Sequence, residues 1–201
     1  MFSSMISPKR FLVSEILYLE EFGFFVSICL DPAYQEINPL GMVTALDIGL
    51  DRAMTQADAI LQYVAELYSE ANLGANEGIN NQFEFNETMA FLTGDFHPAY
   101  WPFFKPQHYT TSSDKAELQA VRDAINARID RVMRHLDRLI GDSGHVYGNK
   151  RSVADAYAFV MARWSQNLEK TWKDYPHLAA FMENMLEDET VHKVLGAAKG
   201  K

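Results

Sequence analysis

The chain is poor in cysteine and in long apolar runs, and each shortage excludes a class of protein. One cysteine, Cys29, stands among 201 residues, so no disulfide can form within the chain. It lies in FFVSICL, a predicted strand, where a lone cysteine is ordinarily a small buried apolar side chain. No apolar run approaches the roughly 18 residues that a transmembrane helix needs, so we expect no membrane span.

Positive charge is also scarce. The 18 Lys and Arg residues are outnumbered by 27 Asp and Glu residues, which gives a net charge of −9 at pH 7. An acidic chain matches neither the phosphates of nucleic acid nor an anionic membrane surface, so we expect neither partner. The first residues, MFSSMISPKRFLVSEILYLEE, lack the order of a secretory signal, because their basic pair follows the first apolar stretch. These features predict a cytoplasmic globular protein.

Several common catalytic signatures are missing as well. The six histidines show no HExxH pattern and no paired metal-ligand spacing, so we expect no metal. No phosphate-cradling glycine loop and no Gly-x-Ser-x-Gly turn is present.

Strand and helix patterns alternate over the first part of the chain and then give way to helices alone. Predicted strands cover FSSMIS, 24–30 and 42–48, with a brief fourth strand ending near Thr55. Apolar residues at helical spacing predict helices over 10–22 and 59–67, and a short helical or irregular link over 31–39. This order predicts a small mixed sheet with helices packed on it.

After LGAN at 73–76 the strand signals stop. Helical spacing is found over 83–96, and most strongly over 114–140, where apolar residues recur at steps of three and four. Ser152 and Asp155 form a capping-box-like helix start, which we interpret as structural. We therefore expect an α/β domain over residues 1–70 and an all-helical domain over residues 76–201.

Four local phrases, in this order, resemble the glutathione S-transferases, especially the bacterial beta class. They are INPLGMVTALD, MTQADAILQYVAE, FHPAYWPFF and YGNKRSVADAYAFVMARW. The resemblance implies a thioredoxin-like N-terminal domain that holds a glutathione site, followed by the helical C-terminal domain of that family. It also implies a homodimer in which the sheet domain of one subunit packs on the helical domain of the other.

The resemblance places the cysteinyl part of glutathione on the backbone of the residue before a cis-proline. The matching residues are Val43 and Thr44. A cis bond before a non-proline residue costs about 3–4 kcal/mol, so we predict a trans Val43-Thr44 bond and a weakened site. The alternative is a plain strand turn with no ligand.

The γ-glutamyl end would lie at the start of the helix that follows, where the family has a Glu-Ser pair. The corresponding residues are Gln56 and Ala57, which offer no carboxylate and no hydroxyl. Asp58 is the nearest replacement for the missing charge, although an acidic residue in a first helical turn is also ordinary capping.

The resemblance also implies residues that activate the thiol of glutathione. Only some of the matching positions here carry a side chain that can do so. Phe11 stands where the beta class has its cysteine and can neither stabilise a thiolate nor form a mixed disulfide. Ser7 remains as a hydroxyl donor, or else as a strand-end serine. His97 matches the histidine near the thiol in beta-class enzymes, or else is a helix-end residue beside Pro98.

The same resemblance assigns an apolar substrate pocket to a set of aromatic residues, for which core packing is the alternative. They are Phe11, Tyr100, Trp101, Phe104 and Trp164.

Two functions remain open at this point. The first is a glutathione transferase that conjugates glutathione to apolar electrophiles through an altered site. The second is a non-catalytic protein on the same scaffold, either a binding or regulatory protein with a protein partner or a ligandin that carries small apolar molecules. The sequence alone leaves open whether the chain is an enzyme.

Overall fold

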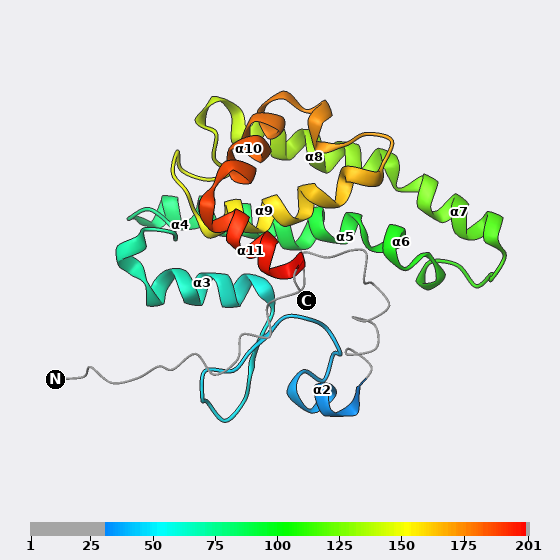
Figure 1. Cartoon of the computed structure of the whole chain (residues 1–201), viewed down its shortest axis with the longest axis horizontal. Helices are drawn as coiled ribbons and strands as arrows, with labels where there is room; N and C mark the ends of the chain where they lie inside the picture. The colour runs from blue at the N-terminus through cyan, green and yellow to red at the C-terminus, as the bar shows by residue number, and fades with distance from the viewer. Residues whose placement is uncertain (1–30, 200–201) are drawn as a thin grey trace. The chain divides into compact units, whose positions relative to one another are not determined.

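The computed structural model of the chain describes residues 31–199 (Figure 1). These residues divide into two compact units, one made of 31–67 and 192–199 and the other of 68–191. The predicted elements FSSMIS, 10–22 and 24–30 lie outside the described residues, as does Cys29.

Over residues 31–67, the described N-terminal part of the first unit contains two helices and a two-stranded sheet. Helix α2, Pro32–Ile37, confirms the predicted helical link. Pro32 occupies its first turn, and the Asp31 carboxylate accepts the N–H of Ala33 at 2.9 Å. Helix α3, Ala57–Leu67, buries Ile60 and Ala65.

The sheet pairs strand β1, Ala45–Leu46, with strand β2, Met54–Thr55, in antiparallel register. Ala45 lies opposite Thr55, and Leu46 lies opposite Met54. Strand β1 is shorter than the predicted strand over 42–48, because a turn follows it at once. In that turn the Asp47 carboxylate accepts the N–H of Gly49 at 2.8 Å, and Gly49 has a φ of 82°.

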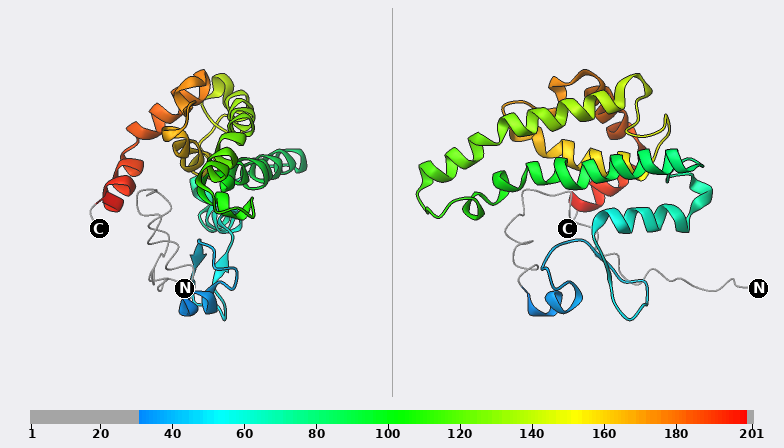
Figure 2. Two further views of the ribbon diagram at one scale, coloured as in Figure 1. Left: turned by 90° about the vertical axis from the view of Figure 1, so that its right-hand side faces the viewer. Right: turned by 180° about the vertical axis from the view of Figure 1, so that it is seen from behind.

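The second unit is helical throughout its described length. Its α-helices are α4 Ile79–Phe91, α5 His97–Ala99, α6 Trp101–Phe104, α7 Lys115–Ala124, α8 Asn126–Ile140, α9 Val153–Arg163 and α10 Pro176–Glu187, followed by α11 Glu189–Lys199, which ends in the first unit. Shorter turns are η2 Ser69–Ala71, η3 Leu92–Phe96, η4 Pro106–His108, η5 Gly141–Ser143, η6 Trp164–Asn167 and η7 Trp172–Asp174. Helix α8 runs alongside the chain of helices from α4 to α6 (Figure 2).

The core of this unit forms around α8 and α9. Helix α9 packs against η3, and α10 packs against both α8 and α9. The periodic segment 114–140 is divided at Ile125 into α7, which buries no residue, and α8, which supplies the buried stripe. The buried residues of α8 are Ile129, Val132, Met133, Leu136 and Ile140.

Two prolines that would break a helix interior stand at helix starts instead. Pro98 lies in the first turn of α5, directly after the π-helical turn η3, and Pro102 lies in the first turn of α6. The π-helical turn η3 carries the chain from α4 into α5 without a loop. His97 and the aromatic residues after it are therefore set on rigid helical backbone.

Across residues 31–199, no helix combines the length and the apolar character that a bilayer crossing demands.

Candidate functional site

The first part of the candidate site is the segment that leads from α2 into β1. The hydroxyl of Tyr34 donates to the carbonyl of Met42 at 2.8 Å, and the side-chain amide of Asn38 donates to the same carbonyl. These bonds fix the backbone next to Val43, the residue that the sequence assigns to the cysteinyl part of glutathione. Thr44 is 5% exposed, and its hydroxyl has no hydrogen-bond partner among the described residues.

The Val43-Thr44 peptide bond is cis, so the prediction of a trans bond is wrong. That prediction considered only the local preference of an amide before a non-proline residue. In the folded chain the segment is held from both sides, by the two side chains on the Met42 carbonyl and by the pairing of β1 with β2. A rule based on neighbouring residues alone does not include such tertiary contacts.

The second part is the N-terminus of α3. Gln56 has a φ of 72°, in the left-handed region that residues with a side chain seldom adopt. Its carbonyl accepts the N–H of Ile60 at 3.0 Å, so the helix starts directly after it. The N–H groups of Ala57 and Asp58 consequently have no intrahelical partner. Such a helix end favours a carboxylate ligand through free amides and the helix dipole.

Asp58 has a contact of its own along α3. Its carboxylate oxygen Oδ1 accepts Nε2 of Gln62 at 2.7 Å, one helical turn further on. This bond fixes the rotamer of Asp58 on the helix surface. The Asp58 carboxylate is thus engaged along α3, and its role toward a ligand ammonium stays a proposal.

In the second unit an aromatic cluster surrounds His97. The ring of Trp164, at the end of α9, lies 5.1 Å from His97, 5.5 Å from Tyr100 and 5.0 Å from Phe104, between ring centroids. The ring centroid of Trp101 lies 6.0 Å from that of His97. The structure thus brings together the five residues that the sequence assigned to this unit.

These aromatic residues differ in exposure, and this difference distinguishes residues packed in the core from residues that could contact a ligand. Tyr100 is fully buried, its hydroxyl lies 3.8 Å from the sulfur of Met133, and burial raises the pKa of that hydroxyl. Trp101 is 43% exposed, whereas Phe104 and Trp164 are half-buried. Tyr100 is therefore core, and the three other rings offer the surface that an apolar molecule could contact.

His97 is held as a neutral base. Burial lowers the pKa of His97 from 6.5 to about 4, so its imidazole carries no charge near neutral pH. Its Nδ1 lies 2.8 Å from the hydroxyl oxygen of Tyr157 on α9. No sequence pattern indicates this role for Tyr157, because a tyrosine in the apolar run after Ser152 is typical of an ordinary core residue.

Ser7 and Phe11, the remaining predicted site residues, lie outside the described residues.

Ser152 and Asp155 form the capping box that the sequence predicted, at the start of α9. The buried carboxylate of Asp155 accepts the N–H of Ser152 at 2.6 Å and the N–H of Val146 at 2.8 Å. Burial raises the pKa of Asp155, and these hydrogen bonds only partly oppose that rise. The pair fixes the start of α9 and, through it, the position of Tyr157.

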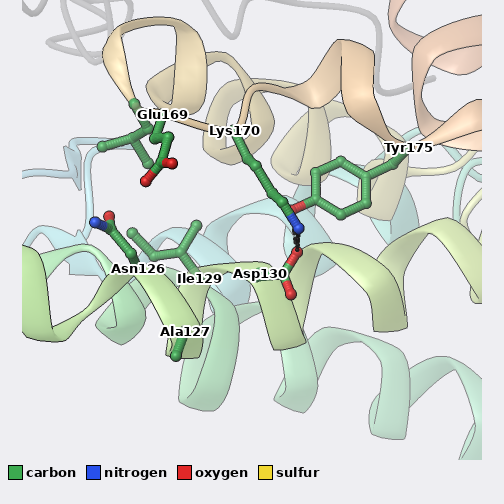
Figure 3. Close-up of a pocket in the computed structure, with 8 residues that line it drawn as sticks. Asn126, Ala127, Ile129, Asp130, Glu169, Lys170 and Tyr175 are labelled. Atoms are coloured by element: carbon green, nitrogen blue, oxygen red, sulfur yellow. Dashed lines mark hydrogen bonds and ion pairs between the residues drawn. The ribbon is translucent and has the colours of Figure 1, made fainter.

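A separate cavity of about 220 Å³ lies beside the N-terminal half of α8 (Figure 3). Lys170 and Tyr175 reach Asp130 from the chain after η6, each at 2.9 Å, and Arg134 completes the cluster at 2.9 Å. Partial burial would raise the pKa of Asp130, but these three hydrogen bonds hold it at about 2. The polar groups thus satisfy one another and fasten this loop to α8. The cavity is lined by Asn126, Ala127, Ile129, Asp130, Leu168, Glu169, Lys170 and Tyr175.

The chain is similar to known glutathione S-transferases both in sequence and in structure. The family model described as "Glutathione S-transferase, C-terminal domain" matches residues 92–189. Glutathione S-transferase GST-4.5 of Xanthomonas campestris pv. campestris is 29% identical over 166 residues, which cover 83% of this chain and 80% of that protein.

Solved structures show the same similarity. A bacterial beta class glutathione S-transferase of Sphingomonas chungbukensis has a TM-score of 0.69 at 29% identity, over 82% of this chain and 78% of that one. A sphingomonad glutathione S-transferase complexed with glutathione has a TM-score of 0.72 at 27% identity, over 87% of this chain and 84% of that one.

Proposed function

We propose that the chain, which is similar in sequence and fold to glutathione S-transferases, acts as one: it binds glutathione and conjugates the thiol to apolar electrophiles. The family's glutathione site is only partly kept in the sequence, so the proposal depends on what the altered positions can still do. Its parts are a γ-glutamyl site, a thiol-activating group and an apolar surface for the electrophile.

The observation that carries the proposal is the start of α3. The left-handed conformation of Gln56 turns the chain so that α3 begins with the amides of Ala57 and Asp58. Two free N–H groups at a helix N-terminus can bind the γ-glutamyl carboxylate, and the helix dipole adds to that attraction. The side-chain oxygen of Gln56 can accept a hydrogen bond from the ligand ammonium, though without the charge of a glutamate.

The thiol requires a donor that stabilises its anion. Phe11 cannot supply one, which leaves the Ser7 hydroxyl and the His97 ring as the candidates. Because His97 is neutral near pH 7, it can act only as a hydrogen-bond donor to sulfur and not as a cation. In the reaction the thiol loses its proton to solvent, the thiolate forms a carbon–sulfur bond, and the leaving group departs with its electron pair.

The electrophile would contact the aromatic surface of the second unit. Trp101 exposes nearly half of its side chain, and Trp164 and Phe104 are within aromatic contact of one another. Flat apolar compounds gain from such a surface by burial and by ring contacts. We therefore propose activated aryl halides and other apolar electrophiles as the substrate class.

We also propose that the protein is a homodimer. The support is the outer surface of α4, where Ile79 is 83% exposed and Phe83, one turn later, is 64% exposed. Adjacent exposed large apolar side chains are more often found at interfaces than on free surfaces. The mass measured by light scattering during size exclusion should be twice 22.9 kDa; the monomer mass would contradict the dimer.

The proposed activity is tested by measuring conjugation of glutathione to an activated aryl halide. Three proteins are compared: the wild type, the His97→Gln variant and the His108→Gln variant. The His108→Gln variant is the matched control. His108 is exposed on η4, and its substitution also removes a histidine from the second unit. Turnover by the wild type and by His108→Gln is expected. Turnover no faster than the uncatalysed reaction would reject the transferase.

A further inference from the structure

Within residues 31–199, one polar partner and several aromatic neighbours hold the His97 ring in position. The hydroxyl oxygen of Tyr157 lies 2.8 Å from Nδ1, a short hydrogen bond, and Tyr157 is itself buried. The rings of Trp164 and Trp101 lie 5.1 Å and 6.0 Å from the imidazole, both edge to face. Turning the ring over would break the bond at Nδ1, so the ring is held in one orientation.

A neutral imidazole has one N–H donor and one acceptor nitrogen, and the bond at Nδ1 decides which is which. Burial keeps the His97 ring neutral, because its pKa falls to about 4. If Nδ1 carried the proton, Nε2 would be an acceptor and could not stabilise a thiolate. If Tyr157 donates, Nε2 carries the proton and becomes the donor.

The chemistry of the two groups favours donation by tyrosine. A phenol, with an ordinary pKa near 10, is a much stronger acid than the N–H of a neutral imidazole. The unprotonated imidazole nitrogen is in turn a better acceptor than a phenol oxygen. The O–H···N arrangement therefore pairs the stronger donor with the stronger acceptor.

We propose that Tyr157 is a positioning residue: its hydroxyl donates to Nδ1 of His97 and holds the ring in the Nε2–H tautomer. The consequence for catalysis depends on the proposed function, since only a glutathione transferase would use the Nε2–H group as a donor to sulfur. The tautomer itself does not depend on that function, and it can be measured without any ligand.

The test is ¹⁵N NMR of histidine-labelled protein near neutral pH, in which two-bond proton–nitrogen correlations show which ring nitrogen carries the proton. His97→Gln identifies the His97 signals among those of the six histidines. Wild-type His97 is expected as a single Nε2–H tautomer. An Nδ1–H tautomer in the wild type would overturn the proposal, whatever the variants show.

Tyr157→Phe removes the donor and keeps the ring. The expected result is loss of the single tautomer, with both neutral forms in exchange; an unchanged tautomer would contradict the positioning role. Tyr147→Phe is the matched control, because Tyr147 is also buried and its hydroxyl donates to the carbonyl of Asn81 at 2.9 Å. In that variant the His97 signals should be unchanged.

A kinetic measurement separates this inference from the proposed function. If the wild type conjugates glutathione, Tyr157→Phe should lower kcat and leave the KM for glutathione nearly unchanged, since only the donor to sulfur is disturbed. If the wild type does not conjugate glutathione, the transferase proposal fails. The tautomer measurement still decides the role of Tyr157.

Discussion

The hydroxyl of Tyr34 on α2 donates to the carbonyl of Met42 at 2.8 Å and links the first helix of the described chain to the candidate glutathione rim. Tyr34→Phe should therefore lower the free energy of unfolding by about 1 kcal/mol, the usual net worth of one hydrogen bond. It should also weaken glutathione binding, because the backbone beside Val43 becomes less fixed. Chemical denaturation and calorimetric titration measure the two effects.

Tyr68→Phe is the control for that change, because Tyr68 is exposed in the linker after α3. Its stability and glutathione affinity should equal those of the wild type. If Tyr34→Phe binds glutathione as tightly as Tyr68→Phe does, the rim does not contribute to the ligand site.

Gln56→Glu should tighten glutathione binding. A carboxylate at the start of α3 would pair with the ligand ammonium by a charge-assisted hydrogen bond, which is about twice as strong as the neutral one. We expect an increase in affinity of roughly tenfold, or about 1.4 kcal/mol.

The control for Gln56→Glu is Gln82→Glu, which adds the same charge on the exposed surface of α4. It should leave the affinity unchanged. Equal effects of the two substitutions would show that net charge, and not the site at α3, governs binding.

His97 should make stability depend on pH between its two pKa values. The folded-state pKa of about 4 lies below the ordinary 6.5, so the unfolded chain binds the proton more readily. The folded state is therefore favoured by the neutral His97 ring above pH 6.5, and this stabilisation is lost as pH falls toward 4. Its upper limit is roughly 3 kcal/mol.

Urea unfolding at several pH values in this range measures the effect, with His97→Gln beside the wild type. The stability advantage of the wild type over the variant should shrink as pH falls. In His108→Gln, which removes an exposed histidine, the pH dependence should follow that of the wild type. A constant difference between wild type and His97→Gln would mean that the ring is not buried as described.

Asp130 should stabilise the second unit through the cluster beside α8. Asp130→Asn replaces the carboxylate that Lys170, Arg134 and Tyr175 share, and about 1–2 kcal/mol of stability should be lost at neutral pH. Because the pKa of Asp130 is lowered from 3.8 to about 2, the contribution is present above pH 3.8 and is lost as pH falls through about 2.

Glu169→Gln is the matched control, since Glu169 lines the same cavity. Its stability should change by less than about 0.5 kcal/mol. Equal losses in the two variants would show that the cluster around Asp130 is not what fastens the loop.

Sequence patterns predicted much of the fold. The thioredoxin-like domain followed by the family's helical domain is confirmed by the family model and by the beta class structure. The helix start at Ser152 was predicted from a local signal, because a capping box acts over a few residues, whereas 31–39 was predicted only as a helical or irregular link and contains helix α2. The division of 114–140 at Ile125 was missed, since both halves carry the same helical spacing.

The candidate site was less predictable. His97 and Trp164 are far apart in sequence, and only the resemblance to the family placed them together; the structure shows their rings 5.1 Å apart. The cis bond at Val43-Thr44 was predicted wrongly from the local preference of the amide, and the hydrogen bond between Tyr157 and His97 was missed because it joins residues 60 positions apart in the sequence. No pattern of neighbouring residues specifies such contacts.

The most direct test of the whole account is calorimetric titration of the wild-type protein with reduced glutathione near neutral pH, up to millimolar ligand. Cysteinylglycine, which lacks the γ-glutamyl group, serves as the control ligand. The account predicts that glutathione binds in the micromolar to low-millimolar range and that cysteinylglycine does not bind, because α3 holds the γ-glutamyl end. No heat of binding with glutathione at those concentrations would contradict it.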